Sequence, residues 1–326
     1  MGVSAVTAGE GAVRPEPFDK LRGDLVEGLA GASPHARENS SSARTEVVAR
    51  RAVPLAVRIR RRWSGWLGLS VLVVLLLAAV AAPLLARADP NLIDLSHKLE
   101  GPSQQHLLGT DHLGRDMLAR LLHGGRTALT VGLLSVLGSV LLAMLAGGTS
   151  GYFGGTVDLL WSAIFNVLLT VPGLILTLAI IGVLGTGQLS LMVALIGADW
   201  AGQARVIRGA VLEAREQGYV EAARAVGARG GYVLWRHIAP NVAGTIAVLA
   251  TLDLAGVVLT VSSLSCLGIG VQPPQADWGT MLSDARPYAG SAPGLMLLPG
   301  ACIVAFAVSA NLAGDALRDL FDPRRR

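Results

Sequence analysis

Apolar residues in this chain are gathered into long, nearly unbroken stretches, unlike the alternating or one-sided patterns of a water-soluble fold. Six stretches each approach the roughly 20 apolar residues that an α-helix needs to cross a hydrocarbon layer of about 30 Å. They cover residues 66–87, 128–150, 158–182, 188–207, 242–270 and 293–314. The pattern predicts an all-α membrane protein with six transmembrane helices, for which the lipid bilayer is the solvent.

The overall composition agrees with a membrane protein and argues against a nucleic-acid partner. Hydrophobic residues make up 52% of the 326 residues and charged residues only 15%, which is too few charges for a surface that faces water. The net charge is +4, but the basic residues flank the apolar stretches and do not form one basic face with aromatics.

The first 55 residues have a different composition. Residues 1–55 are rich in Gly, Ala, Ser, Pro, Arg and Glu and show no apolar period, which is typical of a segment that cannot form its own core. We expect a disordered cytoplasmic tail there, with a docking role as the alternative.

Arginines near the ends of the stretches indicate how the chain is oriented. They precede the first stretch, follow the fourth and follow the sixth: Arg58, Arg60, Arg61 and Arg62; Arg205, Arg208, Arg215, Arg224, Arg229 and Arg236; Arg318, Arg324, Arg325 and Arg326. The positive-inside rule therefore predicts that both termini are cytoplasmic. The loop 88–127 also holds basic residues among acids, which is a mild objection because acids count little in this rule.

Small residues recur at every fourth position near the end of the second stretch. Ala143, Gly147, Gly151 and Gly155 lie on one helix face, and small residues on one face let another helix approach closely in lipid. The alternative is that the last two glycines form the turn that closes the stretch.

Three residues inside the stretches are candidates for a translocation path. Pro172 interrupts the third stretch, where a broken helix lines a cavity or a plain kink forms. Asp199 and Asp253 lie in the fourth and fifth stretches, and an ionisable residue inside a membrane is a functional candidate by default. For Asp253 we expect a contact to the solute or to a sister subunit, and the alternative is a hydrated helix end.

The polar segment 209–240, between the fourth and fifth stretches, is the most informative part of the chain. Residues 213–226 are mostly good helix formers, and Gly227 follows as a stop in a left-handed conformation. We expect a short helix there and a second helix before Pro240. The run Glu221-Ala222-Ala223, with Gly227 four residues after Ala223, resembles the E-A-A-x-x-x-G signature of bacterial binding-protein-dependent ABC permeases.

Three further segments are similar to the C-type permeases of dipeptide and oligopeptide importers. They are His106-Leu107-Leu108-Gly109-Thr110-Asp111-His112-Leu113-Gly114-Arg115-Asp116; Gly268 to Pro274 followed by Trp278-Gly279; and Asn311 to Arg324. The resemblance runs from about residue 66 to the C-terminus. Ala239 departs from it, because the family usually has Leu before this Pro.

The resemblance implies both a fold and a set of partners. The fold is that of a type I ABC importer permease, in which a coupling helix is inserted between spans four and five. The implied partners are a homologous sister permease, two ABC ATPase subunits and an extracytoplasmic substrate-binding protein. The coupling residues carried over by the motif are Glu221, Ala222, Ala223, Gly227 and Pro240. The implied solute is a peptide, with nickel, haem or another small solute as the alternative.

The predicted organisation has four parts: a cytoplasmic tail, 1–55; the first helix with an extracytoplasmic loop, 56–127; a permease domain of five helices, 128–316, with the coupling segment 209–240; and a cytoplasmic tail, 317–326. A secondary transporter is a weaker alternative, since it would show an internal repeat. An intramembrane enzyme would rest on Asp199 and Asp253 alone.

No residue pattern indicates catalysis, a metal or a cofactor. The two lysines, Lys20 and Lys98, do not follow a phosphate-binding glycine loop, so ATP hydrolysis is expected from partner subunits. The histidines of the loop 88–127 lack metal-site spacing, and Cys266 and Cys302 stand alone in apolar runs.

Overall fold

The computed structural model describes residues 55–86 and 88–321, with the side chains of 55–62, 64 and 321 left out. The predicted tail 1–55 therefore lies outside the described residues apart from Leu55, and so does the end of the predicted tail 317–326. The chain divides into two units, Met1–Ile59 and Arg60–Arg326, and the account below concerns the second unit.

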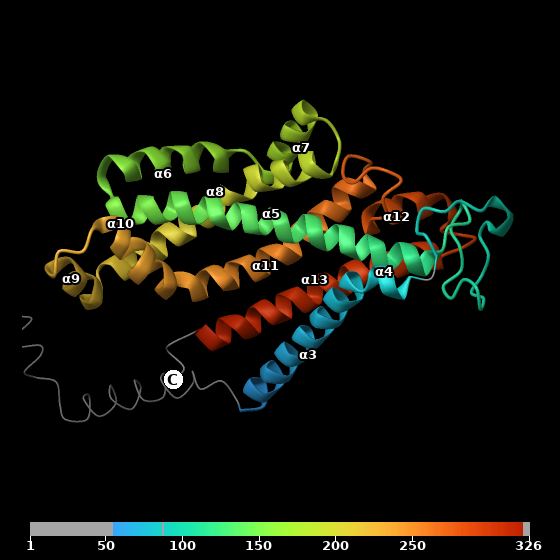
Figure 1. Ribbon diagram of the computed structural model, residues 1–326, viewed down its shortest axis with the longest axis horizontal. Coiled ribbons are helices and arrows are strands. Elements are labelled where there is room, and N and C mark those ends of the chain that lie inside the picture. Colours follow the sequence, from blue (N-terminus) through green and yellow to red (C-terminus); the bar gives the residue numbers. More distant parts are fainter. Residues whose placement is uncertain (1–54, 87, 322–326) are drawn as a thin grey trace, which may run out of the picture. The chain divides into compact units, whose positions relative to one another are not determined.

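Helices account for nearly all regular structure in the described residues (Figure 1). The long ones are α3 (Leu55–Val80), α5 (Met117–Phe153), α6 (Gly155–Thr170), α7 (Gly173–Leu184), α8 (Gln188–Arg215), α11 (Ala239–Cys266) and α13 (Gly294–Phe321). The short ones are α4 (Ala82–Leu85), the 3-10 helix η1 (Leu95–His97), α9 (Gly218–Ala225), α10 (Gly230–Val233), the π-helix η2 (Leu234–Ile238), α12 (Trp278–Ala285) and the 3-10 helix η3 (Arg286–Tyr288). The prediction of an all-α protein is confirmed for the described residues.

Each predicted apolar stretch coincides with a helix or with the α6–α7 pair. By length and apolar character, three described helices are able to cross a membrane: Met117–Phe153, Gly230–Cys266 and Gly294–Leu320. The α6–α7 pair makes a fourth if it is counted as one span. The helix Gly65–Val80 is apolar but shorter. The count of six crossings therefore stays a prediction.

Two of the predicted stretches differ in shape from the helices that form. The second was expected at 128–150, but α5 begins at Met117 because the Asp116 carboxylate accepts a hydrogen bond from the Ala119 N–H and caps the helix. The third was expected at 158–182, but α6 and α7 meet at an angle of 90°. Val171 and Pro172 are extended at that break, since proline cannot donate the hydrogen bond that a continuous helix requires.

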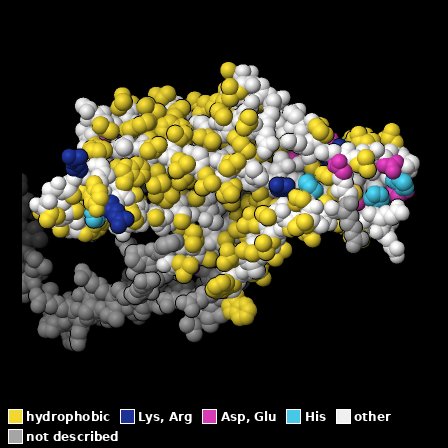
Figure 2. Space-filling view, in the orientation of Figure 1, with side chains coloured by type: hydrophobic (Ala, Val, Ile, Leu, Met, Phe, Trp, Pro, Cys, Tyr) yellow, Lys and Arg dark blue, Asp and Glu magenta, His cyan; other side chains and the backbone are white. Residues whose placement is uncertain are grey.

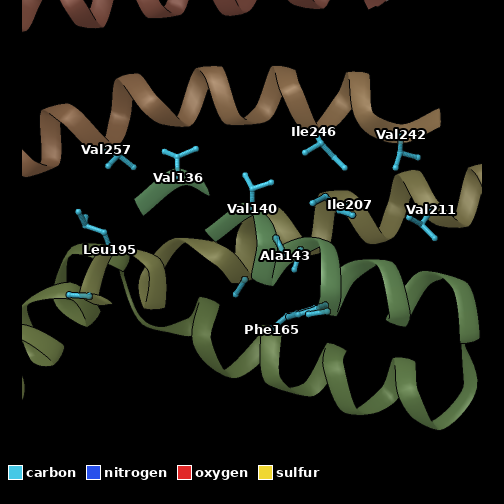
Figure 3. Close-up of a cluster of buried hydrophobic side chains, with 14 of the residues drawn as sticks. Val136, Val140, Ala143, Phe165, Leu195, Ile207, Val211, Val242, Ile246 and Val257 are labelled. Carbon is cyan, nitrogen blue, oxygen red and sulfur yellow. The ribbon is translucent and has the colours of Figure 1, made fainter. Parts of the chain in front are cut away.

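The core lies between α5 and α8, and α6, α7 and α11 pack around it. Figure 3 shows Val140 and Ala143 of α5 among side chains from α6, α8 and α11. A Cβ at Gly147 would collide with the Ala204 carbonyl, and one at Gly151 would lie 2.8 Å from the Arg208 carbonyl. The predicted small-residue face is confirmed at these two glycines. Gly155 instead begins α6 with a φ of +53°, as the turn alternative requires.

A second cluster joins α3, α11, α12 and α13 to the first part of α5. Trp278, at the start of α12, is buried there and donates a hydrogen bond of 2.9 Å from Nε1 to the Leu121 carbonyl. Asp277 caps α12 by accepting from the Gly279 and Thr280 N–H groups. Burial raises the pKa of the Asp277 carboxyl above its usual range.

Polar groups gather at the two ends of this helix bundle. Figure 1 shows α9 and α10 at one end and the loop 88–116 with α12 at the other. In the face shown in Figure 2, hydrophobic side chains cover the middle of the bundle, and acidic and histidine side chains gather at the end that holds the loop. Such an arrangement suits a protein whose middle faces lipid.

Candidate functional site

The short helix expected at 213–226 is divided in the structure. Residues 213–215 complete α8, Gln217 is extended with φ −79° and ψ +144°, and α9 covers Gly218–Ala225. Gly218 at the start of α9 is a weak helix former, so an interruption there costs little. The division gives α9 a direction of its own at the end of the bundle (Figure 1).

Gly227 ends the segment as the sequence predicts. Its φ is +82°, and two hydrogen bonds close the end of α9: Gly227 N–H to the Arg224 carbonyl, 2.9 Å, and Ala228 N–H to the Ala223 carbonyl, 3.1 Å. This pair of bonds is a Schellman motif, in which glycine is favoured because a Cβ is strained at positive φ. Among the described residues other than its two chain neighbours, no heavy atom lies within 4 Å of where a Cβ on Gly227 would be. The requirement for glycine is therefore conformational and not steric.

One buried side chain and two surface contacts attach α9 to the bundle. Val220 is fully buried, and Ala223 packs against the main core cluster. The Tyr219 hydroxyl accepts a hydrogen bond of 2.8 Å from Asn241 Nδ2 at the start of α11. The Arg224 guanidinium lies 5.1 Å from the centre of the Tyr152 ring at the end of α5, a cation–π distance. α9 is thus held between α5 and α11.

The outer face of α9 and its surroundings carries apolar and acidic side chains. Glu221 and Ala222 are exposed, and Glu221 lies in the first turn, where a carboxylate is favoured by the helix dipole. Within the described residues the Glu221 side chain forms no ion pair. Val226 is 86% exposed, and Tyr232 and Trp235 are largely exposed as well. These exposed side chains lie in α9, at its end, and in the α10–η2 segment that follows it.

The sequence predicted a helix that ends before Pro240, but in the structure Pro240 lies inside a helix. α10, η2 and α11 form one continuous helix, Gly230–Cys266, in which Pro240 is at the first turn of α11. The Ala239 N–H bonds to the Leu234 carbonyl, five residues back, which is π-helical spacing. A π-turn of this kind accommodates a proline, because proline offers no N–H to the regular helix.

An ion pair links α8 to α6 near the same end. Arg208 Nε and Nη2 donate to the two Asp158 carboxylate oxygens at 2.5 and 2.6 Å, and the Ser150 hydroxyl donates to the same carboxylate at 2.5 Å. Arg215 Nη1 donates to the Tyr152 carbonyl at 2.9 Å. These arginines, which the sequence assigned only to orientation, also hold the helix ends together.

Of the three translocation-path candidates, the structure brings two together. Asp199 lies on α8 and Asp253 on α11, and these two helices pack against each other. Gln203, one turn after Asp199, donates a hydrogen bond of 2.8 Å from Nε2 to Asp253 Oδ2. Pro172 is exposed on a different pair of helices, at the α6–α7 break. Asp253 lies near the middle of the 28 residues of α11, about 20 Å from either helix end.

At the other end of the bundle, a buried ion cluster fixes the loop 88–116. Asp111 Oδ1 accepts from the Leu113 and Arg115 N–H groups, and its Oδ2 accepts from Arg115 Nε at 2.6 Å. Arg120 Nε lies 3.6 Å from the same Asp111 oxygen. Arg115 Nη2 reaches Asp284 of α12 at 3.3 Å. The segment His106–Asp116 resembles the C-type permeases, and in the structure its ion pairs attach the loop to α5 and α12.

Two histidine–aspartate pairs complete the loop. His106 Nδ1 lies 2.9 Å from Asp116 Oδ2, and His97 Nδ1 lies 2.8 Å from Asp94 Oδ2. Hydrogen bonds from the Ser96 hydroxyl and His97 lower the pKa of Asp94 to about 2, and the bond to Asp94 raises the pKa of His97. Within the described residues, no three His, Cys, Asp or Glu side chains are grouped to hold a metal ion.

Sequence reasoning missed several residues that position these sites. Tyr152 and Gln203 had no motif around them, and Asn241 follows Pro240 of the coupling motif but was given no role. Gln203 had only its four-residue spacing from Asp199 as a signal, since residues four apart share a helix face. Asp284 and Trp278 contact partners more than 150 residues away. No local pattern predicts such partners.

The described residues thus form a helix bundle with the short helix α9 at one end and the loop 88–116 at the other. Residues 139–326 match the family described as binding-protein-dependent transport system inner membrane component. Residues 56–102 match the N-terminal TM domain of oligopeptide transport permease C. The chain belongs to the binding-protein-dependent transport system inner membrane component family, and it is a multi-pass membrane protein.

Three bacterial permeases illustrate the range of its relatives. The chain is 36% identical over 259 residues to the dipeptide transport system permease protein of Alkalihalophilus pseudofirmus, covering 79% of this chain and 85% of that protein. It is 39% identical over 262 residues to the nickel transport system permease protein of Escherichia coli K12, covering 80% and 95%. It is 34% identical over 270 residues to the oligopeptide transport system permease protein of Bacillus subtilis, covering 83% and 88%.

Proposed function

We propose that this chain is a non-catalytic permease subunit that forms half of the translocation pathway of an ATP-driven peptide importer. The observation that carries the proposal is α9, a short exposed helix ended by Gly227 and attached to both α5 and α11. A rigid element attached to two long helices can transmit a partner's movement to them. Relatives named for dipeptide and oligopeptide transport support peptides as the solute.

The partners follow from this role. Two ABC ATPase subunits supply the energy, a homologous sister permease supplies the other half of the path, and an extracytoplasmic binding protein delivers the solute. Glu221, Ala222, Ala223, Gly227 and Pro240 form the coupling segment towards the ATPase. The exposed side chains of Val226, Tyr232 and Trp235 are suited to contact a protein partner, because exposed apolar side chains beside polar groups are typical of such surfaces.

The topology in this proposal has six crossings and both termini in the cytoplasm. Segment 209–240 is cytoplasmic, and residues 88–127 with residues near α12 are extracytoplasmic, in agreement with their positions at opposite ends of the bundle (Figure 1). The proposed domains are the tail 1–55, the first helix and loop 56–127, the permease domain 128–316 and the tail 317–326. Pro172, Asp199 and Asp253 line the path.

Cysteine labelling tests this topology. Single cysteines placed in 88–116 or 286–291, in a chain without Cys266 and Cys302, are expected to react with a membrane-impermeant maleimide in intact cells. Cysteines at exposed positions of 218–236 should react only after permeabilisation, because the positive-inside rule keeps this arginine-rich segment in the cytoplasm. The reverse labelling pattern would contradict the proposal.

Transport by a reconstituted complex tests the function itself. We expect proteoliposomes that contain this chain and its genetically linked partners to accumulate radiolabelled dipeptides or oligopeptides only with ATP and the binding protein. Omitting the ATPase subunits should reduce uptake to background. The nickel permease relative makes nickel the second candidate, so nickel uptake without peptide uptake would replace the peptide assignment.

A further inference from the structure

Asp199 and Asp253 are two acidic residues inside the apolar stretches that are proposed to cross the membrane. Each lies in a long helix, α8 or α11, and Gln203, one turn after Asp199 on α8, donates a hydrogen bond to Asp253. Within the described residues, neither carboxylate forms an ion pair. The arginines that follow Asp199 along α8 are engaged elsewhere: Arg205 donates to Asn166 at 2.8 Å, and Arg208 pairs with Asp158.

Gln203 supplies a second and independent sign that a ligand belongs here. Its side chain is only 6% exposed, and its Nε2 donates to Asp253 Oδ2. Its Oε1 is buried and has no hydrogen-bond partner in the described residues. A buried acceptor without a donor costs free energy comparable to a lost hydrogen bond. The amide therefore presents an unused acceptor beside two carboxylates.

These three side chains offer more acceptors than donors. A carboxylate is an acceptor when ionised, and of the two N–H groups on Gln203 Nε2 one already donates to Asp253 Oδ2. Acidic groups at membrane depth are costly unless they are paired. The group that satisfies all three side chains is a cation with several N–H donors.

Resting on the proposed function, we propose that Asp199, Gln203 and Asp253 form a subsite of the translocation path that receives the protonated amine of the solute. An ammonium group has three donors, which matches the two carboxylates and the free Gln203 oxygen. A metal ion fits less well, because nickel favours nitrogen ligands and magnesium or calcium needs six or more oxygens. This subsite gives the permease itself a preference for peptides with a free amino terminus.

A ratio of two uptake rates separates the permease's preference from that of the binding protein. Proteoliposomes with the whole complex are given a dipeptide or its N-acetylated form, and ATP-dependent uptake of each is measured for the parent and for Asp253→Asn. The binding protein is the same in every experiment, so any change in the uptake ratio is caused by the substitution in this chain. We expect Asp253→Asn to lower the free-amine to N-acetyl ratio about tenfold, as loss of one close charge pair does.

Matched variants define the outcomes. Asp199→Asn should act in the same direction, Asp253→Glu should keep most of the ratio, and Glu100→Gln, which removes an exposed carboxylate from the loop 88–116, should leave it unchanged. An unchanged ratio in both Asn variants overturns the subsite. Loss of sister-permease recovery in both would also overturn it, in favour of a contact between subunits. Failure of the proposed function is seen separately, as absence of ATP-dependent uptake by the parent complex.

Discussion

Gly227→Val is expected to reduce both ATPase recovery and solute uptake about tenfold or more, while the chain still reaches the membrane. Gly227 has a φ of +82°, and a residue with a side chain loses roughly 1–2 kcal/mol in that conformation. A β-branched residue is disfavoured further at positive φ. Because about 1.4 kcal/mol corresponds to a factor of ten, the Schellman end of α9 should be largely replaced by other conformations.

The effect should be confined to the coupling segment. In the part of the chain that the structure describes, no heavy atom beyond the two chain neighbours lies within 4 Å of the position of a Cβ on Gly227, so we expect valine to cause no collision and the bundle to remain folded. Gly182→Val is the matched control: Gly182 is also in open space, but it lies inside α7 without a positive φ. This control is expected to assemble and transport like the parent.

Pull-down of the ATPase subunits and vesicle uptake give the two measurements. Glu221→Ala is expected to weaken both more mildly than Gly227→Val, because it removes an exposed carboxylate but leaves the backbone of α9 unchanged. If Gly227→Val assembles and transports like the parent, α9 is not the coupling element. A loss of membrane insertion in Gly227→Val but not in Gly182→Val would assign Gly227 to folding instead.

Local patterns in the sequence were sufficient for the helices and for the end of α9. Apolar length located the helices, since every predicted stretch overlaps one. The glycine after the helix formers of 213–226 indicated a left-handed end, because few other residues adopt positive φ at low cost. The break at Gln217 was missed, since only Gly218 among its neighbours is a weak helix former.

Contacts between distant residues were beyond sequence reasoning. The kink at Pro172 was expected, but its 90° angle depends on how α7 packs on α8 and not on proline alone. The bond from Gln203 to Asp253 joins residues 50 apart in sequence, and the contact from Arg115 to Asp284 joins residues 169 apart. A single sequence contains no period or spacing that specifies such pairs.

The buried ion cluster around Asp111 provides the second large expected effect. Asp111→Ala should lower the free energy of unfolding by about 3 kcal/mol. Asp111 is the buried acceptor that Arg115 and Arg120 share, at 2.6 and 3.6 Å, and its side chain is 8% exposed. Removing it leaves two buried guanidinium groups without their main partner, and an uncompensated buried charge is strongly destabilising.

Thermal unfolding of the purified chain in detergent measures this change. A loss of 3 kcal/mol corresponds to a fall in Tm of roughly 10 °C for a chain of this size class. Asp284→Ala is the matched control, because it removes a carboxylate from the same cluster whose side chain is 40% exposed. Solvent screens such a contact, and its loss should cost about 1 kcal/mol or less.

A second substitution separates lost charge pairing from lost packing. Adding Arg115→Met to Asp111→Ala removes one of the two uncompensated charges while keeping an unbranched apolar side chain, and replacing a buried ion pair by apolar groups is often neutral. We therefore expect the double variant to be more stable than Asp111→Ala alone. Equal Tm values for Asp111→Ala and Asp284→Ala, or a double variant less stable than Asp111→Ala, would mean that buried charge does not govern the stability of this loop.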